Sequence, residues 1–295
     1  MNCQHCKSGD VLQHRINKHG LTRLYCKECR KYSDLKITPK ILLLDIEVSH
    51  GIYKLYAPGK QTVGWKSISE RAFMLGWCAK WLYDSEVKKS FVTPKEAINR
   101  DDERVTRGIH ALLSKADLVI AHNGNSYDLR KLNWFFALHN LEPNNCYQSI
   151  DTYRRSRDIF GAESLSLGYL LKMFGFVGKA SIHAEDWEAV ENGDPKAIKR
   201  ATEYCVDDVL GLEDLYLKIR PWMRTHPNLG VFAEMYQPLE AGDEYCPRCL
   251  QTIGEMKWNK KYYTLSGQVH RSCNCPHCGA VLRQTEKMTR SARVK

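Results

Sequence analysis

Eight of the twelve cysteines fall into four Cys-x-x-Cys pairs, and all four pairs lie near the ends of the 295-residue chain. This spacing suits the tetrahedral binding of Zn²⁺ by four thiolates, and it is typical of reducing compartments. The pattern argues against a disulfide scaffold and predicts a cytoplasmic protein with a zinc module at each end. The paired cysteines are Cys3, Cys6, Cys26 and Cys29 in the first module and Cys246, Cys249, Cys275 and Cys278 in the second.

Two predicted zinc ribbons, residues 1–38 and 241–286, flank a longer central domain over residues 39–225. Each ribbon is too short to build an adequate core, so metal binding would supply its folding free energy. Cys273 competes with Cys275 as a ligand, but only Cys275 pairs with Cys278 at the Cys-x-x-Cys spacing. We expect a linker over residues 226–240 and a basic, disordered tail over residues 287–295.

The basic charge of the protein is confined to its two ends. Residues 1–40 carry nine Lys and Arg against three Asp and Glu, residues 241–295 carry ten against four, and the central 200 residues carry 25 against 27. This partition favours ends that bind a polyanion and a middle that binds metal cations. The alternative is that zinc is only a structural staple in each ribbon. Because no window approaches 18 uninterrupted apolar residues, we expect no membrane span.

The central segment alternates strand and helix patterns, which predicts an α/β domain with a mixed sheet. Two short apolar runs, 41–44 and 118–121, have the character of buried strands. The longest helical pattern starts at Pro195 and stops before Pro221. Further strands are predicted over 71–81 and 88–92, and further helices over 101–115, 128–140 and 166–174.

Four carboxylates stand where these elements end or begin. Asp45 and Glu47 follow the first buried strand and project from one face, because alternate strand residues share a face. Asp128 starts a helix after a polar turn, a position that an N-cap would also explain. Asp208 lies one helical turn after Tyr204, on the same side of the long helix. Four such carboxylates converging in one cleft would require cations to neutralise them.

The three segments resemble the exonuclease motifs of a known superfamily. Asp45-x-Glu47, Asn123-x-x-x-Tyr-Asp128 and Tyr204-x-x-x-Asp208 occur in the order found in DnaQ-like DEDD nucleases. They are most similar to the DEDDy branch, which includes the proofreading domains of family B DNA polymerases. The residue five positions before Asp208 is Glu rather than the His of the DEDDh branch. The resemblance covers about residues 41–222 and excludes both ribbons.

The resemblance implies an RNase H-like fold with two divalent cations, Mg²⁺ or Mn²⁺, in the active site. By that likeness Asp45 bridges both metals, Glu47 and Asp208 complete the first, and Asp128 acts through water on the second. Hard oxygen ligands select these metals. A pair of such ions can activate a water and stabilise the leaving oxygen of an in-line displacement.

The same resemblance gives roles to three further residues. It implies that Tyr204 orients the attacking water, and that Asn123 and Ile46 contact the substrate. Without the resemblance, Tyr204 is equally a core aromatic and Asn123 a turn residue. The expected activity is 3′–5′ exonucleolytic release of nucleoside 5′-monophosphates from DNA. An exoribonuclease and a non-catalytic zinc-ribbon DNA-binding adaptor are the alternatives.

Deleting either ribbon is expected to weaken DNA binding and to leave a short saturating oligonucleotide degraded at nearly the full rate. Each lost phosphate contact flattens the dependence of log affinity on log salt by roughly one unit. The measurements are binding titrations at several salt concentrations and elemental analysis of zinc, which should fall from about two ions per chain to about one. Equal salt slopes for intact and truncated proteins would mean that the ribbons are structural staples or protein-binding modules.

Overall fold

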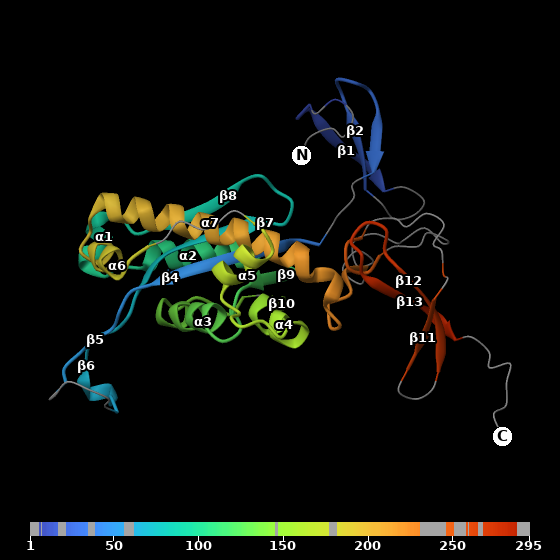
Figure 1. Cartoon of the computed structure of the whole chain (residues 1–295). Helices are drawn as coiled ribbons and strands as arrows, with labels where there is room; N and C mark the ends of the chain where they lie inside the picture. The colour runs from blue at the N-terminus through green and yellow to red at the C-terminus, as the bar shows by residue number, and fades with distance from the viewer. Residues whose placement is uncertain are drawn as a thin grey trace. The chain divides into compact units, whose positions relative to one another are not determined.

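The structure is a computed structural model, and Figure 1 shows its helices and strands. It describes residues 6, 8–16, 22–34, 39–55, 62–144, 147–176, 182–230, 246–250, 258, 260–264 and 268–287. The chain divides into a central unit, residues 40–219, and a unit that comprises residues 1–39 and 220–295. Across the described ranges, no helix combines the length and the hydrophobicity needed to cross a bilayer.

The central unit is built on a five-stranded mixed sheet in the order β10-β9-β4-β7-β8. β4, β9 and β10 run parallel, whereas β7 is antiparallel to β4 and to β8. The mixed α/β sheet predicted from the sequence is therefore confirmed. The strands are β4 (Ile41–Val48), β7 (Met74–Trp81), β8 (Val87–Phe91), β9 (Leu118–Ala121) and β10 (Gln148–Asp151).

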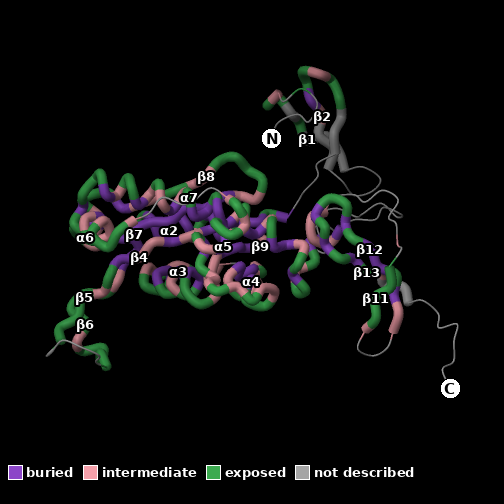
Figure 2. The backbone as a smooth tube through the Cα atoms, in the orientation of Figure 1, coloured by how far each residue is buried: buried purple, intermediate pink, exposed green. Residues whose placement is uncertain are grey.

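Seven helices of the central unit surround this sheet in its described residues, and Figure 2 shows the buried strands between them. The predicted helix over 195–219 is found with these bounds, whereas α1, α4 and α6 were not predicted. The helices are α1 (Pro94–Asn99), α2 (Glu103–Leu113), α3 (Asp128–Leu138), α4 (Thr152–Ile159), α5 (Leu167–Met173), α6 (Ala184–Glu191) and α7 (Pro195–Ile219).

Both faces of β4 are apolar in its first half, and its two acidic side chains lie on one face in its second half. Leu42, Leu44 and Ile46 are buried in the main hydrophobic cluster. The strand runs on to Val48, so Asp45 and Glu47 lie within β4 and not just beyond it. Because strand neighbours point to opposite faces, both carboxylates lie opposite that cluster. There the Cys205 thiol of α7 lies 3.6 Å from Asp45 Oδ2.

The start of α7 is fixed by a local turn. Gly193 has φ +79°, in the left-handed region that favours glycine. The Asp194 carboxylate then accepts hydrogen bonds from the backbone amides of Lys196 and Ala197, at 2.7 and 3.0 Å. Pro195 occupies the first helical position, where its missing N–H costs nothing. The helix therefore has a fixed starting point, which sets the positions of Tyr204 and Asp208 along it.

A small two-stranded hairpin follows β4. It consists of β5 (Ile52–Tyr53) and β6 (Ile68–Glu70), with the 3₁₀ helix η1 (Trp65–Ser67) before β6. The Lys54 amide donates to the Ser67 carbonyl at 2.8 Å and helps to hold the two strands together. The sequence patterns did not predict this hairpin.

Each end of the chain forms a three-stranded antiparallel sheet. The first contains β1 (Val11–Ile16), β2 (Thr22–Cys26) and β3 (Tyr32–Asp34). The second contains β11 (Lys260–Tyr263), β12 (Val269–Asn274) and β13 (Val281–Lys287), and the 3₁₀ helix η2 (Arg220–Trp222) precedes it in the chain.

Candidate active site

A cavity of about 530 Å³ opens in the central unit, at the end of β4. It brings together seven residues singled out from the sequence: the four carboxylates Asp45, Glu47, Asp128 and Asp208, with Ile46, Asn123 and Tyr204. Its other lining residues are Val48, His50, His122, Tyr127, Ile182 and Trp187.

The four carboxylates come from three elements that pack around the cavity. Asp45 and Glu47 lie on β4, Asp128 begins α3, and Asp208 is buried on α7. Asp128 Oδ1 accepts a hydrogen bond from the Ile46 amide at 3.3 Å, so its carboxylate ties α3 to β4. Asp207, the neighbour of Asp208, is exposed and does not line the cavity.

Burial and crowding disfavour negative charge in this cavity. Burial, together with the nearby Asp45 carboxylate, raises the pKa of Asp128 to about 8. Tyr204 lines the cavity together with Glu47 and Asp45, and its pKa is raised by burial and by the charges of these two carboxylates. Four carboxylates around one cavity supply the oxygen ligands that hard divalent cations such as Mg²⁺ and Mn²⁺ prefer.

The turn that carries Asn123 is held by a buried carboxylate at the end of β10. Asp151 accepts hydrogen bonds from the amides of Asn123 and Asn125, at 3.0 and 3.2 Å. Asn123 itself has φ +63°, a left-handed conformation that Asn tolerates better than most residues. His122, one residue earlier, is oriented by Thr152 Oγ1 and the Leu165 carbonyl, each at 2.9 Å. The wall of the cavity formed by this turn is therefore fixed by β10 and its connections.

Several residues in or near the site were not assigned a role from the sequence. Tyr127 belongs to the second motif and His122 directly precedes it, so their positions gave a hint. Trp187 comes from α6, where its ring packs edge-on against Tyr204 with centroids 6.2 Å apart. The Cys205 thiol lies within 4.8 Å of oxygens of Asp45 and Glu47. Cys205 is an unspecified position of the third motif, and it does not line the cavity. Trp187 belongs to no motif, and only the fold brings it to the cavity.

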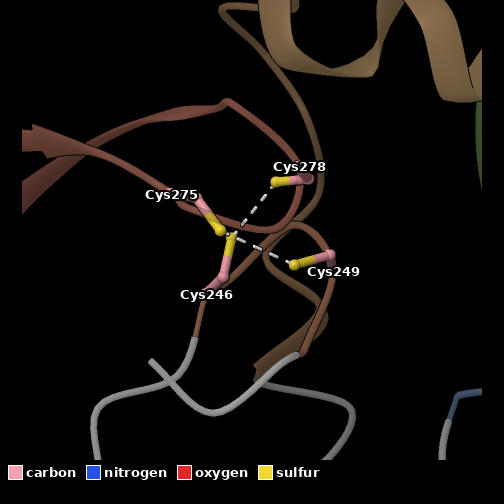
Figure 3. A group of neighbouring side chains, drawn as sticks. All are labelled: Cys246, Cys249, Cys275 and Cys278. Carbon is pink, nitrogen blue, oxygen red and sulfur yellow. Dashed lines mark hydrogen bonds between the residues drawn. The ribbon is translucent and has the colours of Figure 1, made fainter. Parts of the chain in front are cut away.

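Two thiol clusters lie at the ends of the chain. In the second ribbon the Sγ atoms of Cys246 and Cys278 are 3.6 Å apart, and those of Cys249 and Cys275 are 3.9 Å apart (Figure 3). Cys275 belongs to this group of four, whereas Cys273 does not. In the first ribbon the thiols of Cys6, Cys26 and Cys29 cluster, and Cys3 lies outside the described residues. Both groups are compatible with bound zinc.

Comparison with known proteins identifies the family of the central unit. The model of the RNase H superfamily matches residues 62–220, which is more than half of the chain. The chain therefore belongs to the RNase H superfamily, and the RNase H-like fold expected from the motifs is confirmed. The matched range contains Asp128, Tyr204 and Asp208 and begins after Asp45 and Glu47.

A solved structure also resembles the chain. It is that of the family B DNA polymerase from the hyperthermophilic archaeon Pyrobaculum calidifontis, with 15% sequence identity and a TM-score of 0.44. The match covers 81% of this chain and 32% of the polymerase chain. A search of curated proteins finds no match.

Binding of Mn²⁺ is expected to release a proton from Asp128 at neutral pH. With a pKa of about 8, this carboxyl is mostly protonated at pH 7 in the metal-free protein, and a cation must displace that proton. The apparent Mn²⁺ affinity should therefore rise with pH up to about 8. Isothermal titration calorimetry in two buffers of different ionisation enthalpy measures the released proton. Asp128→Asn should abolish the release, and an unchanged release would assign the proton to another group.

Proposed function

We propose that the protein is a 3′–5′ exonuclease of the DEDDy type that hydrolyses DNA to nucleoside 5′-monophosphates with two divalent cations. The observation that carries this proposal is the meeting of Asp45, Glu47, Asp128, Asp208 and Tyr204 around one cavity. These residues belong to three separate motifs and three separate elements. Their convergence supports a shared chemical task, since surface charges or helix caps would not need to face the same space.

The four carboxylates would hold the metals. Asp45 would contact both ions, Glu47 and Asp208 would complete the first, and Asp128 would act through water on the second. When bound, the two ions would lower the pKa of an attacking water and stabilise the charge that develops on the leaving 3′ oxygen. The Ile46 amide fixes the orientation of Asp128, which leaves its carboxylate facing the cavity.

Tyr204 and Asn123 would position the reactants. The Tyr204 hydroxyl keeps its proton at neutral pH, because burial and the neighbouring carboxylates raise its pKa. It can therefore donate a hydrogen bond to a carboxylate or accept one from water, and so orient the nucleophile. Asn123 and Ile46 line the same cavity and would contact the terminal nucleotide.

The two thiol clusters would each hold one structural Zn²⁺, with Cys3 as the fourth ligand in the first ribbon. The basic charge of both ends favours contact with nucleic acid outside the cavity. The charge partition and the family membership together support a nucleic-acid substrate. DNA and RNA differ at the 2′-hydroxyl, which the substrate cavity would have to accommodate or reject.

Time-resolved degradation of end-labelled DNA and RNA oligonucleotides, with Mg²⁺, Mn²⁺ or EDTA, tests the proposed function. We expect metal-dependent shortening from the 3′ end, with 5′-monophosphates as products and faster degradation of DNA. Faster degradation of RNA than of DNA would mean that the protein is an exoribonuclease. Metal-dependent activity on neither polymer would leave the zinc-ribbon adaptor as the alternative.

Asp45→Ala and Asp208→Ala are each expected to slow cleavage by about 10³-fold or more, because each removes metal-binding oxygens from the cavity. Asp207→Ala is the matched control, since Asp207 is adjacent in sequence, exposed and outside the cavity. Single-turnover rates on a 3′-labelled oligonucleotide measure the effect, and circular dichroism checks the fold. If the Asp207 and Asp208 variants lost cleavage activity equally, Asp208 would have no specific role in metal binding.

Tyr204→Phe is expected to slow the chemical step more modestly, by about 10- to 100-fold, because it removes a water-orienting hydroxyl and keeps every carboxylate. The affinity for Mn²⁺ should stay at the wild-type value. Rapid-quench kinetics under single-turnover conditions measure the rate, and calorimetry measures the metal affinity. A wild-type single-turnover rate would show that Tyr204 is only a packing residue.

A further inference from the structure

An exposed apolar arm begins beside the cavity. We call residues 51–55 and 62–70 the arm; they include β5, η1 and β6. Most of its described residues are exposed, and Figure 2 draws it mainly in green. Trp65 is 78% exposed and Tyr53 is 49% exposed. Four smaller apolar side chains of the arm are exposed as well: Ile52, Leu55, Val63 and Ile68. A soluble domain seldom keeps so many large apolar side chains in one short segment without a partner.

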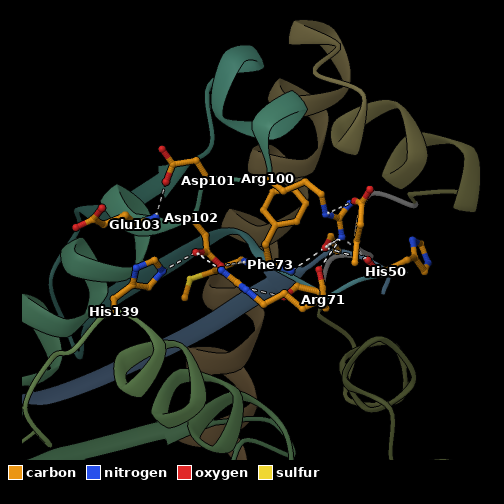
Figure 4. Close-up of polar contacts among 12 residues, drawn as sticks. His50, Arg71, Phe73, Arg100, Asp101, Asp102, Glu103 and His139 are labelled. Atoms are coloured by element: carbon orange, nitrogen blue, oxygen red, sulfur yellow. Dashed lines mark hydrogen bonds and ion pairs between the residues drawn. The ribbon is translucent and has the colours of Figure 1, made fainter. Parts of the chain in front are cut away.

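Both ends of the arm are held by one guanidinium group. Arg100 Nη2 donates to the His50 carbonyl, just before the arm, and to the Arg71 carbonyl, just after it, at 2.9 Å each (Figure 4). Its Nε forms an ion pair with Glu70 at 2.9 Å, and the group stacks 4.6 Å from the centre of the Phe73 ring. Arg100 therefore fixes both ends of the arm to the central unit.

A second polar group, the Asp102 carboxylate, holds the segment that follows the arm. The Asp102 side chain is fully buried and accepts hydrogen bonds from Arg71, at 3.2 and 3.3 Å, and from the Met74 amide at 2.9 Å. His139 Nε2 lies 2.6 Å from the same carboxylate, on its other side (Figure 4). These contacts tie the segment after the arm to α2 and α3. The residues that flank the exposed arm are therefore held firmly to the central unit.

The position of the arm connects it to the candidate active site. His50 lines the cavity, and β5 begins only two residues later. The His50 amide and its Nδ1 each lie 2.8 Å from Glu191 Oε1, which fixes this part of the rim. When the end of a polymer is bound in the cavity, the rest of the strand must pass over the cavity's edge. The arm starts at this edge, next to His50.

The charges of the arm favour nucleic acid over protein as its partner. Residues 51–70 contain three Lys, one Glu and no Asp, and the Glu is Glu70, which pairs with Arg100. Lys54 follows Tyr53, and Lys66 Nζ lies 5.8 Å from the centre of the Trp65 ring. Lysine is depleted in protein–protein interfaces, whereas aromatic rings interleaved with cations are the usual platform for single-stranded nucleic acid.

We infer that the arm is a stacking surface for the bases of a single-stranded nucleic acid whose 3′ end occupies the cavity, with Trp65 and Tyr53 as the stacking residues. This inference rests on the proposed function and adds a contact outside the reacting groups. Lys54 and Lys66 would meet the phosphates between the stacked bases. The arm would thereby hold the strand behind the nucleotide that is removed.

The Tyr53→Ala/Trp65→Ala double variant tests this surface. Its dissociation constant for a fluorescent oligothymidylate of about 20 nucleotides, longer than the roughly 4–16 that one binding module covers, should rise about tenfold or more. Fluorescence anisotropy without added Mg²⁺ or Mn²⁺ measures binding without cleavage. An oligonucleotide of equal length with abasic sites should bind the wild type and the variant equally, because it offers no bases to stack. Both substituted side chains are exposed, so the fold should be unaffected.

Tyr83→Ala is the matched control. Tyr83 is 64% exposed and follows Trp81, which pairs with Leu42 at the start of β4, whereas the arm follows the other end of that strand. This variant should bind oligothymidylate like the wild type. An unchanged dissociation constant in the double variant, or an equal loss for normal and abasic oligonucleotides, would overturn the inference and favour a protein partner for the arm.

A small substrate separates this inference from the proposed function. The p-nitrophenyl ester of thymidine 5′-monophosphate needs only the cavity, so the double variant should hydrolyse it at the wild-type rate. If the wild type hydrolyses neither the ester nor oligonucleotides, the proposed exonuclease activity is wrong. The binding comparison without added metal would still decide the role of the arm.

Discussion

Repulsion among carboxylates is the constraint on which the rest of the site depends. Asp128 is almost completely buried, and this burial, followed by the charge of nearby Asp45, raises its pKa to about 8. Such crowding costs stability unless cations or protons offset it. The acids lie on well-anchored elements, whose packing offsets this loss of stability. The central strand carries Asp45 and Glu47, and the long helix that carries Asp208 starts at a fixed turn.

The supporting structure around the acids is largely polar and comes from segments without motifs. Asp151 holds the turn of Asn123, and Arg100 holds the backbone that follows β4. Each of these groups binds backbone atoms of a neighbouring segment rather than facing the reaction. These hydrogen bonds to backbone atoms hold a wall of the cavity in place, and the Asp151 charge also raises the pKa of Asp128. The rigidity of the site therefore derives from side chains that belong to other parts of the sheet.

Sequence patterns predicted the parts of the structure that follow from local periodicity. The two buried strands, the long helix and the facing of Asp45 and Glu47 depend on alternation and helical repeat, which are visible in the residues themselves. Trp187 and Asp151 could not be predicted as part of the site, because their positions depend on how α6 and β10 pack. The hairpin after β4 escaped prediction because its strands have only two and three residues.

The Cys205 thiol gives the acidic site a problem of metal selectivity. It lies 3.6 Å from Asp45 Oδ2, and a thiolate at that place would be a soft ligand that attracts zinc, the ion that the terminal thiol clusters suit. Burial raises the pKa of Cys205 well above its ordinary value, so the sulfur keeps its proton. A protonated thiol is a poor ligand, which leaves the oxygens to choose the ion. Sulfur suited to zinc and oxygen suited to a harder divalent cation can thus stay chemically apart in one chain, although a thiol lies beside the acids.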